Sequence, residues 1–174
     1  RLANRDTIAA AVDSTMCRLL MNSRKVSSEE FSGDMLLVRD IIIKYIQRGI
    51  MRYDIANEGY TIAGLEKDVD WQCPISNGRM VNLSGRADRI DRRADGALQI
   101  IDYKSGSTPH LEYNGMEALF RGGAQERVSN IFQTMLYSMI LHRKYKLESC
   151  PSLYFASKML NDDYSPLILD RTTG

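Results

Sequence analysis

The segment Leu98-Gln99-Ile100-Ile101-Asp102-Tyr103-Lys104 begins as an apolar run and ends with an acid and a base. Alternate side chains of a β-strand share a face, so Leu98, Ile100, Asp102 and Lys104 are expected on one side, with Asp102 and Lys104 about 7 Å apart at the backbone. A carboxylate and an ammonium at the edge of an apolar core need a partner or a chemical role. Taken alone, this D-x-K pattern is more often a plain ion pair at a strand end.

A second acid stands in the segment before it, in Gly85-Arg86-Ala87-Asp88. Gly85 interrupts a strand pattern, which indicates a bulge or a close approach of another chain segment. The turn signal Ala94-Asp95-Gly96 predicts a short hairpin between the two strands, which would bring Asp88 beside Asp102. Two converging carboxylates with a nearby lysine suit a hard divalent cation that keeps room for water and a phosphate.

The elements that position these residues follow from periodicity. Helical spacing covers Asp6–Met21, Ser28–Arg52 (with Ser27 or Ser28 as its cap) and Gln125–Lys146, and strand patterns cover Tyr60–Trp71, Met80–Asp91, Ala97–Lys104, Ser152–Lys158 and Tyr164–Leu169. This order predicts an α/β fold: a mixed central β-sheet flanked by helices, with a helical N-terminal part.

Three motifs together carry a family resemblance: Gly85-Arg86-Ala87-Asp88, then Asp102-Tyr103-Lys104-Ser105-Gly106, then Gln133-Thr134-Met135-Leu136-Tyr137. The set resembles the PD-(D/E)XK nuclease superfamily, and within it the RecB/AddB-like branch, over roughly Glu66 to Lys158. The resemblance implies a restriction-endonuclease-like core and a metal-dependent DNA nuclease, with exonuclease action in DNA repair and recombination as the expected mode.

The resemblance also implies residue roles. Asp88, Asp102 and the carbonyl of Tyr103 would bind Mg²⁺, for which Mn²⁺ could substitute, and Lys104 would orient the attacking water or offset charge on the phosphorus. Gln133 would contact the site or the DNA backbone, and Tyr137 would position the substrate strand. Without the resemblance, the Gln133/Tyr137 pair is as readily a solvated helix face.

Two features depart from the family pattern. Relatives often supply a histidine or acidic ligand from an upstream helix, yet no histidine precedes His110, so Glu66 is the candidate substitute. As a strand-end charge, Glu66 is more often a surface residue. Some relatives carry a four-cysteine iron–sulfur cluster, which is not expected from Cys17, Cys73 and Cys150.

Nucleic-acid contact would rest on a local basic patch, because the net charge is only +1. The candidates for a phosphate-binding rim are Arg86, Arg89, Arg92, Arg93, Arg121 and Arg127, each of which is more often an ordinary surface arginine.

The side chain of Tyr103 is expected on the opposite face of its strand from Asp102, where it would serve packing.

The 174 residues suit one nuclease domain, with a helical part over 1–58 and a nuclease core over 59–174. The chain starts at Arg1 rather than Met, and we expect a fragment of a longer helicase/nuclease chain with DNA and a helicase-like domain or subunit as partners. Unpaired cysteines, short apolar runs and the lack of a signal peptide predict a cytoplasmic protein without a membrane partner. The alternatives are a catalytically inactive nuclease fold that binds DNA or acts as a scaffold, and a restriction-type endonuclease.

Overall fold

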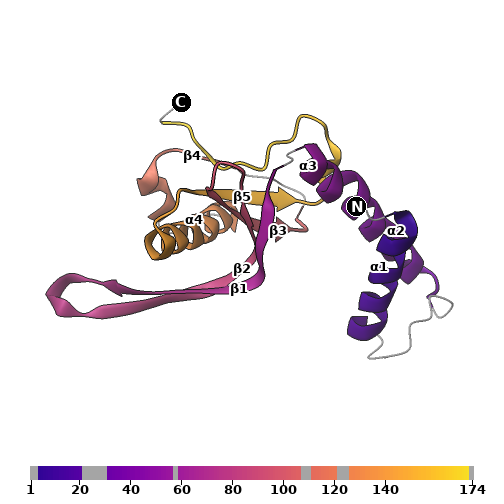
Figure 1. The fold of residues 1–174 in the computed structure, drawn as a ribbon, viewed down its shortest axis with the longest axis horizontal. Coiled ribbons are helices and arrows are strands. Elements are labelled where there is room, and N and C mark those ends of the chain that lie inside the picture. Colours follow the sequence, from indigo (N-terminus) through magenta and orange to yellow (C-terminus); the bar gives the residue numbers. More distant parts are fainter. Residues whose placement is uncertain (1–3, 21–30, 57–58, 107–110, 121–125, 173–174) are drawn as a thin grey trace. The chain divides into compact units, whose positions relative to one another are not determined.

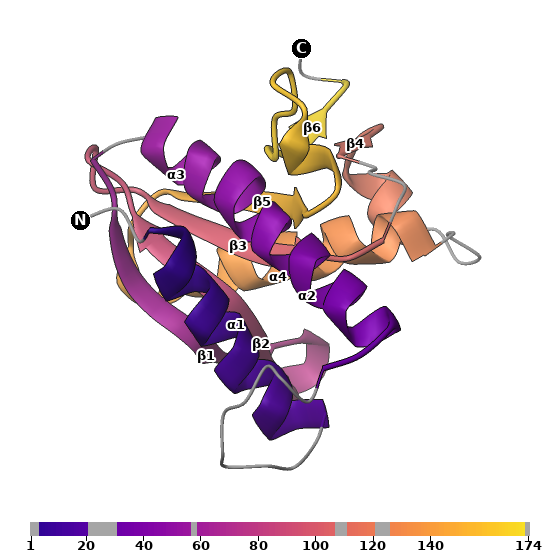
Figure 2. The same ribbon diagram turned by 90° about the vertical axis from the view of Figure 1, so that its right-hand side faces the viewer.

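The computed structural model describes residues 4–20, 31–56, 59–106, 111–120 and 126–172, except for the side chains of 126–128. The chain divides into two compact units. One comprises Arg1–Ala56 with Met159–Asp162, and the other comprises Asn57–Lys158 with Asp163–Gly174. Figures 1 and 2 show the elements of each.

The first unit is helical, as its spacing predicts. It contains α1 (Arg5–Leu20), α2 (Asp34–Tyr45), a π-helical turn (Ile46–Ile50) and α3 (Met51–Ala56). The Asn4 side chain accepts a hydrogen bond of 2.8 Å from the Thr7 amide, which satisfies a donor that the first turn of α1 leaves open. The predicted cap at Ser27 or Ser28 lies outside the described residues.

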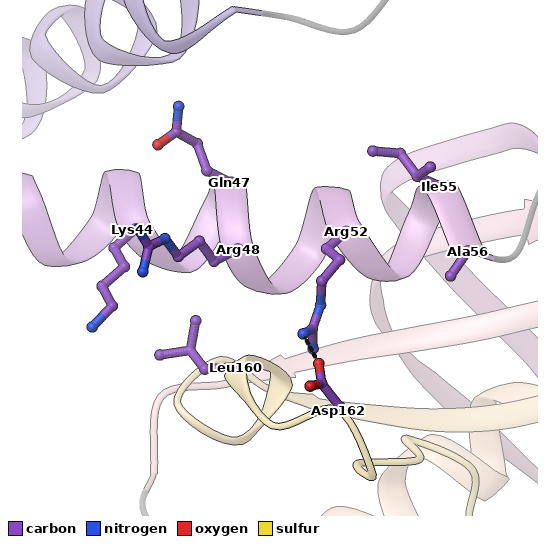
Figure 3. A pocket seen from close by; sticks show the side chains of 8 residues that line it. All are labelled: Lys44, Gln47, Arg48, Arg52, Ile55, Ala56, Leu160 and Asp162. Atoms are coloured by element: carbon purple, nitrogen blue, oxygen red, sulfur yellow. Dashed lines mark hydrogen bonds and ion pairs between the residues drawn. The ribbon is translucent and has the colours of Figure 1, made fainter.

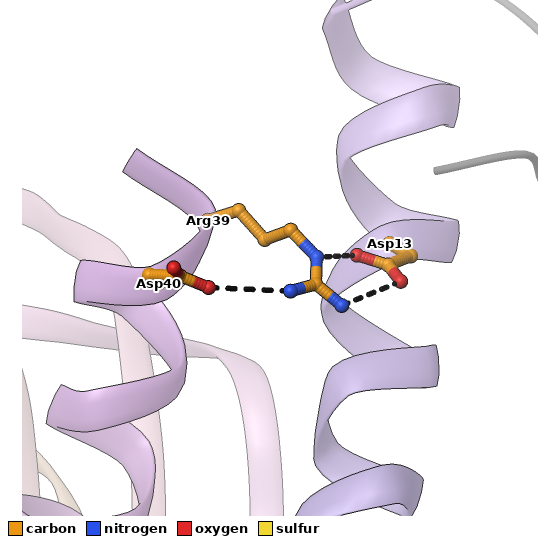
Figure 4. A network of polar contacts seen from close by, with 3 residues as sticks. All are labelled: Asp13, Arg39 and Asp40. Carbon is orange, nitrogen blue, oxygen red and sulfur yellow. Dashed lines mark hydrogen bonds and ion pairs between the residues drawn. The ribbon is translucent and has the colours of Figure 1, made fainter. Parts of the chain in front are cut away.

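The helices of this unit pack through a small apolar core and one ion pair. The core comprises Ile8, Val12, Met16, Cys17, Phe31 and Ile43. Arg39 of α2 binds both carboxylate oxygens of Asp13 on α1, at 2.5 and 3.0 Å, and also reaches Asp40 (Figure 4). A guanidinium group that bonds both oxygens of a carboxylate fixes the two helices in one relative orientation. The last turn of α1 extends past this core, and Leu19 and Leu20 are exposed.

The second unit is built on a mixed four-stranded sheet in the order β1-β2-β3-β5. The strands are β1 (Thr61–Pro74), β2 (Met80–Arg92), β3 (Leu98–Lys104) and β5 (Ser149–Phe155). β1, β2 and β3 pair antiparallel, whereas β3 and β5 pair parallel. The predicted fold class, a mixed sheet with helices and a helical N-terminal part, is confirmed.

Two hairpin turns join β1, β2 and β3, and the second of them is the predicted turn at residues 94–96. At Ser76–Gly78 the backbone of Asn77 and Gly78 has positive φ, and the Ile75 amide closes the turn on the Arg79 carbonyl at 2.8 Å. At the second turn Gly96 has a φ of 85°, and the Arg93 amide donates to the Ala97 carbonyl at 2.9 Å. The first hairpin is much longer than the ladder with β3, and β1 and β2 extend beyond the other strands (Figure 1).

The helix α4 (Glu126–Tyr145) connects β3 to the parallel strand β5 and packs on the sheet. Its apolar side chains are buried in two clusters that include Ile131 and Ile140. A helix in this position is the usual connection between two parallel strands. The end of β3 is therefore covered by α4, which carries the third sequence motif.

The C-terminal segment differs from the prediction. In place of a strand over Tyr164–Leu169, Leu167 forms an isolated bridge with Ser152, and β6 comprises only Leu169–Asp170. β6 pairs with β4 (Glu112–Tyr113), a strand that the sequence did not indicate. Pro166 explains the interruption, because it has no amide to donate to a ladder; its carbonyl accepts from the Leu153 amide at 2.9 Å. Short 3-10 turns cover Met116–Phe120 and Lys158–Leu160.

Candidate active site

The carboxylate of Asp102 is held in the interior at the end of β3. Asp102 is 5% exposed, although the apolar residues that precede it, Ile100 and Ile101, are the ones expected to be buried. The Lys104 ammonium lies 2.5 Å from Asp102 Oδ2, and the Lys104 side chain is itself only 22% exposed. The two charged residues at the strand end are therefore neighbours, as their alternation predicts.

Asp88 reaches the same strand end from β2. The ladder between β2 and β3 runs from Arg92 opposite Leu98 to Arg89 opposite Ile101, and Asp88 is the next residue. Its Oδ2 accepts a hydrogen bond of 2.8 Å from the Tyr103 amide, so a side chain takes the place of a backbone acceptor. This bond fixes the Asp88 carboxylate beside the backbone that joins Asp102 to Lys104.

The electrostatics of Asp102 are unusual for a carboxyl group. Burial raises the pKa of Asp102, Lys104 opposes that change, and the nearby charge of Asp88 raises the pKa further. Its Oδ2 is buried, and the Lys104 ammonium at 2.5 Å is the group that compensates its charge. A buried oxygen with unused acceptor capacity, next to a second carboxylate, fits a divalent cation that prefers oxygen ligands.

A line of contacts continues from Lys104 into α4. Lys104 Nζ lies 3.5 Å from Gln133 Oε1, and the Gln133 amide donates to the Tyr137 hydroxyl at 3.1 Å. Tyr137 is buried, and it packs on Gly85 so closely that a Cβ there would come within 3.0 Å of its ring and hydroxyl. Glycine is thus required at position 85 because the Tyr137 side chain lies so close to its backbone, and not because of a positive φ. The three sequence motifs meet in this line.

A second polar group links β2 to β3. Arg89 pairs with Asp91 through two bonds of 2.7 and 2.8 Å, donates to the Tyr103 hydroxyl at 3.2 Å, and lies over the Tyr60 ring. The Tyr103 ring meets Tyr154 edge-on, with centroids 5.6 Å apart. Tyr103 serves packing through its ring, as its position on the far face indicates.

Arg89 therefore corrects one expectation. It was a candidate for a surface rim, but its side chain is only 4% exposed and its guanidinium is engaged by Asp91 and Tyr103. The reason is that Asp91, the Tyr103 hydroxyl and the Tyr60 ring enclose the guanidinium, so the side of the strand that carries Arg89 is covered and not open to solvent. Asp91, the buried partner, was missed; an opposite charge two residues from Arg89 on a strand was the available signal.

Two further described candidates, Arg86 and Glu66, are exposed side chains of the first hairpin. Arg86 is exposed and forms an ion pair of 2.8 Å with Asp68, which is the main reason that its pKa is raised. Glu66 is exposed on β1, between the residues paired with Ala87 and Arg89, and has a φ of 47°. Arg121 lies outside the described residues, as does the side chain of Arg127.

Two absences hold for the part of the chain that the structure describes. No group of three or more His, Cys, Asp or Glu side chains is placed to hold a metal ion, so Glu66 is not brought together with Asp88 and Asp102. No described helix combines the length and apolar character needed to cross a bilayer.

Comparison with known proteins identifies related sequences. The family model of the PD-(D/E)XK nuclease superfamily matches residues 1–165. Over 78 residues, covering 37% of this chain, the sequence is 40% identical to a subunit of the ATP-dependent helicase/deoxyribonuclease of Streptococcus pneumoniae strain Hungary19A-6. The same values hold for the exonuclease/helicase subunit RexB of Streptococcus pneumoniae serotype 4. In both cases the match spans only 7% of the relative's length.

A solved structure, a repair endonuclease from Pyrococcus abyssi, is similar over 79% of this chain and 46% of that chain. The identity is 16% and the TM-score is 0.30.

Proposed function

Because this chain belongs to the PD-(D/E)XK nuclease superfamily, we propose that it is a divalent-metal-dependent deoxyribonuclease that hydrolyses phosphodiester bonds in DNA. The observation that carries the proposal is the convergence at the end of β3. There Asp102 lies in an ion pair with Lys104, and Asp88 binds the amide of the residue between them.

The proposed metal ligands are the carboxylates of Asp88 and Asp102 and the carbonyl of Tyr103. A bound Mg²⁺ or Mn²⁺ would polarise the scissile phosphate and lower the pKa of an attacking water. The buried position of Asp102 supports this assignment, since an ionised carboxylate in a low-dielectric place is stabilised by a nearby cation.

Lys104 is the proposed catalytic cation. Its ammonium cannot bind a metal, because it has donors and no acceptor, but it can orient a water molecule and offset charge on the phosphate. Gln133 is the proposed positioning residue, since its carbonyl oxygen lies 3.5 Å from Lys104 Nζ and its amide is held by Tyr137. The chain thus supplies acid, base and a polar support from three elements.

The finer features of the activity also belong to the proposal. The partial similarity to subunits named as helicase/deoxyribonuclease and exonuclease/helicase supports exonuclease action on DNA. We place this action in DNA repair and recombination. The similarity also supports a place within a longer helicase/nuclease chain, with residues 1–58 as a helical part and 59–174 as the nuclease core. Arg86, Arg121 and Arg127 are the proposed contacts to the DNA backbone, whereas the buried Tyr137 would help to position the substrate strand through Gln133, whose amide donates to its hydroxyl.

The test is a cleavage assay on end-labelled linear DNA, single-stranded and double-stranded, with Mg²⁺ or Mn²⁺. We expect degradation that EDTA stops and that Asp102→Ala removes. Asp163→Ala, which deletes an exposed carboxylate outside this cluster, should keep the parent rate. Activity that persists in Asp102→Ala, with contaminants excluded, would disprove the assignment. A protein that binds Mn²⁺ but leaves DNA intact would instead favour an inactive nuclease fold.

A further inference from the structure

The first unit carries a row of basic side chains that the nuclease site does not use. Lys44, Arg48 and Arg52, here called the basic row, stand four residues apart along the continuous helical segment α2, π turn and α3. They line a hollow of about 800 Å³ together with Gln47, Ile55, Ala56, Leu160 and Asp162 (Figure 3).

A second hollow shares part of this lining. It has a volume of about 540 Å³ and is lined by Arg5, Asp40 and Ile43 as well as by Lys44, Gln47 and Arg48. Four basic residues of one unit therefore border two hollows that share residues 44, 47 and 48.

The positive charge of the basic row is only partly compensated. Arg52 pairs with Asp162 and donates to the carbonyls of Met159 and Asn161, so it fastens the 159–162 turn (Figure 3). Asp40 already bonds Arg39. Among the described residues no carboxylate pairs with Lys44 or Arg48, and both side chains are exposed. An exposed pair of uncompensated cations in a hollow attracts an anionic ligand.

The backbone aligns these charges. In an α-helix, residues four apart overshoot a full turn by about 40°, so a row at i, i+4 and i+8 spirals off one face. Here the π turn Ile46–Ile50 encloses Arg48, with the Met51 amide bonded to the Ile46 carbonyl. A π turn has more residues per turn, so four of its residues rotate by less than a full turn. This offsets the overshoot of the α-helix and brings Lys44, Arg48 and Arg52 back toward one line. Such turns are rare and frequently mark functional sites.

We infer that Lys44 and Arg48 of the basic row, with Arg5, bind successive phosphates of a nucleic-acid strand, while Arg52 holds the 159–162 turn beside them. Four helical residues rise about 6 Å, a distance that one or two nucleotide steps span. The ligand class is the sugar–phosphate backbone, read without base specificity. This inference rests on the proposed function for its choice of ligand, since DNA is the proposed substrate. The sequence signal is the regular spacing of Lys44, Arg48 and Arg52.

The test measures binding apart from cleavage. The full chain is titrated with a fluorescent single-stranded DNA oligonucleotide in EDTA, across a series of KCl concentrations. The double variant Lys44→Gln/Arg48→Gln should reduce the slope of log K against log[KCl] by about 1.4, that is about 0.7 for each lost phosphate contact. Arg48→Lys keeps the charge and should retain the slope. Arg18→Gln, an exposed arginine of α1, is the matched control and should leave it unchanged.

Three results would overturn the inference: a double variant with the slope of the control, a parent chain that does not bind the oligonucleotide, or poly-glutamate competing as well as DNA at equal charge. Equal competition by poly-glutamate would indicate that the basic row binds an acidic protein segment instead of DNA. Cleavage with Mg²⁺ is scored separately. A parent that binds through the row but does not cut would end the proposed nuclease function alone, whereas one that cuts while the double variant binds normally would end this inference alone.

Discussion

Asp102 is held where an ionised carboxylate is least favourable, and its environment has consequences for stability. Burial and the neighbouring Asp88 raise its pKa above the ordinary value of 3.8, against the opposing effect of Lys104. The folded protein therefore binds this proton more tightly than the unfolded chain does. The stability that Asp102 contributes is complete below its ordinary pKa and is lost as the pH rises through the raised one.

This predicts a pH-dependent effect of Asp102→Asn in the metal-free protein. The variant cannot ionise, so it should melt above the parent at pH 7, and the margin should shrink as the pH is lowered toward 4. Calorimetric melting temperatures in EDTA measure the margin. Asp163→Asn, whose carboxyl group is exposed, provides the comparison. A margin that is constant with pH would show that Asp102 carries no folding-linked proton.

Substitutions of the two acids and of the lysine should have different effects on metal binding and on DNA cleavage. We predict that Asp88→Asn and Asp102→Asn lose both Mn²⁺ binding and DNA cleavage, because each removes a proposed ligand charge. Lys104→Ala should still bind Mn²⁺ yet cleave at least about a hundredfold more slowly, the usual effect of deleting one group that stabilises transition-state charge. Titration calorimetry and single-turnover cleavage measure the two properties. Loss of Mn²⁺ binding in Lys104→Ala would contradict this mechanism.

At the scale of elements, the contact between β2 and α4 supports the position of Lys104 in the proposed site. Gly85 lies against Tyr137, which holds Gln133, and Gln133 in turn meets Lys104. Tyr137 and its neighbours on α4 belong to the same buried cluster as Val69 and Ala87 of the hairpin. A shift of the helix relative to the hairpin would therefore also displace the support of Lys104.

We predict that Gly85→Ala destabilises the protein by about 1–3 kcal/mol, the usual cost of overpacking a tight contact, and slows cleavage. The added Cβ would come within 3.0 Å of the Tyr137 ring and force it to move. Gly106→Ala is the matched control, because nothing lies within 4 Å of its would-be Cβ. In Gly85→Ala/Tyr137→Ala the two losses should be less than additive, which denaturant unfolding would show. Fully additive losses would mean that the two residues do not interact.

At the scale of the whole molecule, the limited ligand set predicts a weak metal site. Two carboxylates and one carbonyl leave a hard cation coordinated mainly by water. The net charge of +1 also offers little general attraction to DNA. We therefore predict that a chain extended upstream binds Mn²⁺ more tightly and cleaves faster than this one.

The comparison uses this chain, its Glu66→Gln variant and the extended chain, with Mn²⁺ affinity and cleavage rate measured for each. Glu66→Gln should match the parent, because Glu66 is exposed and is not gathered with the site acids. Equal affinity and rate in the original and extended chains, with a loss in Glu66→Gln, would show that Glu66 completes the site.

Local pattern alone was sufficient for the strands of the main sheet, the hairpin turn at residues 94–96 and the neighbourhood of the proposed site residues. Asp102 and Lys104 share a face because they are two residues apart on a strand, and the short turn at residues 94–96 brings Asp88 to them. Gln133 and Tyr137 meet because they are four apart on a helix. These relations depend on the repeat of one element or on the closure of one turn, so the sequence determines them.

Contacts between distant elements were decided only by the tertiary structure. The approach of Tyr137 to Gly85, the parallel pairing of β3 with β5 and the link from Lys104 to Gln133 depend on which faces pack together. The burial of Arg89 likewise depends on Tyr103 and Tyr60, which lie on other segments of the chain. The β6 segment also followed tertiary packing, since it pairs with β4, more than fifty residues earlier. Periodicity specifies which side chains share a face, and packing decides what that face meets.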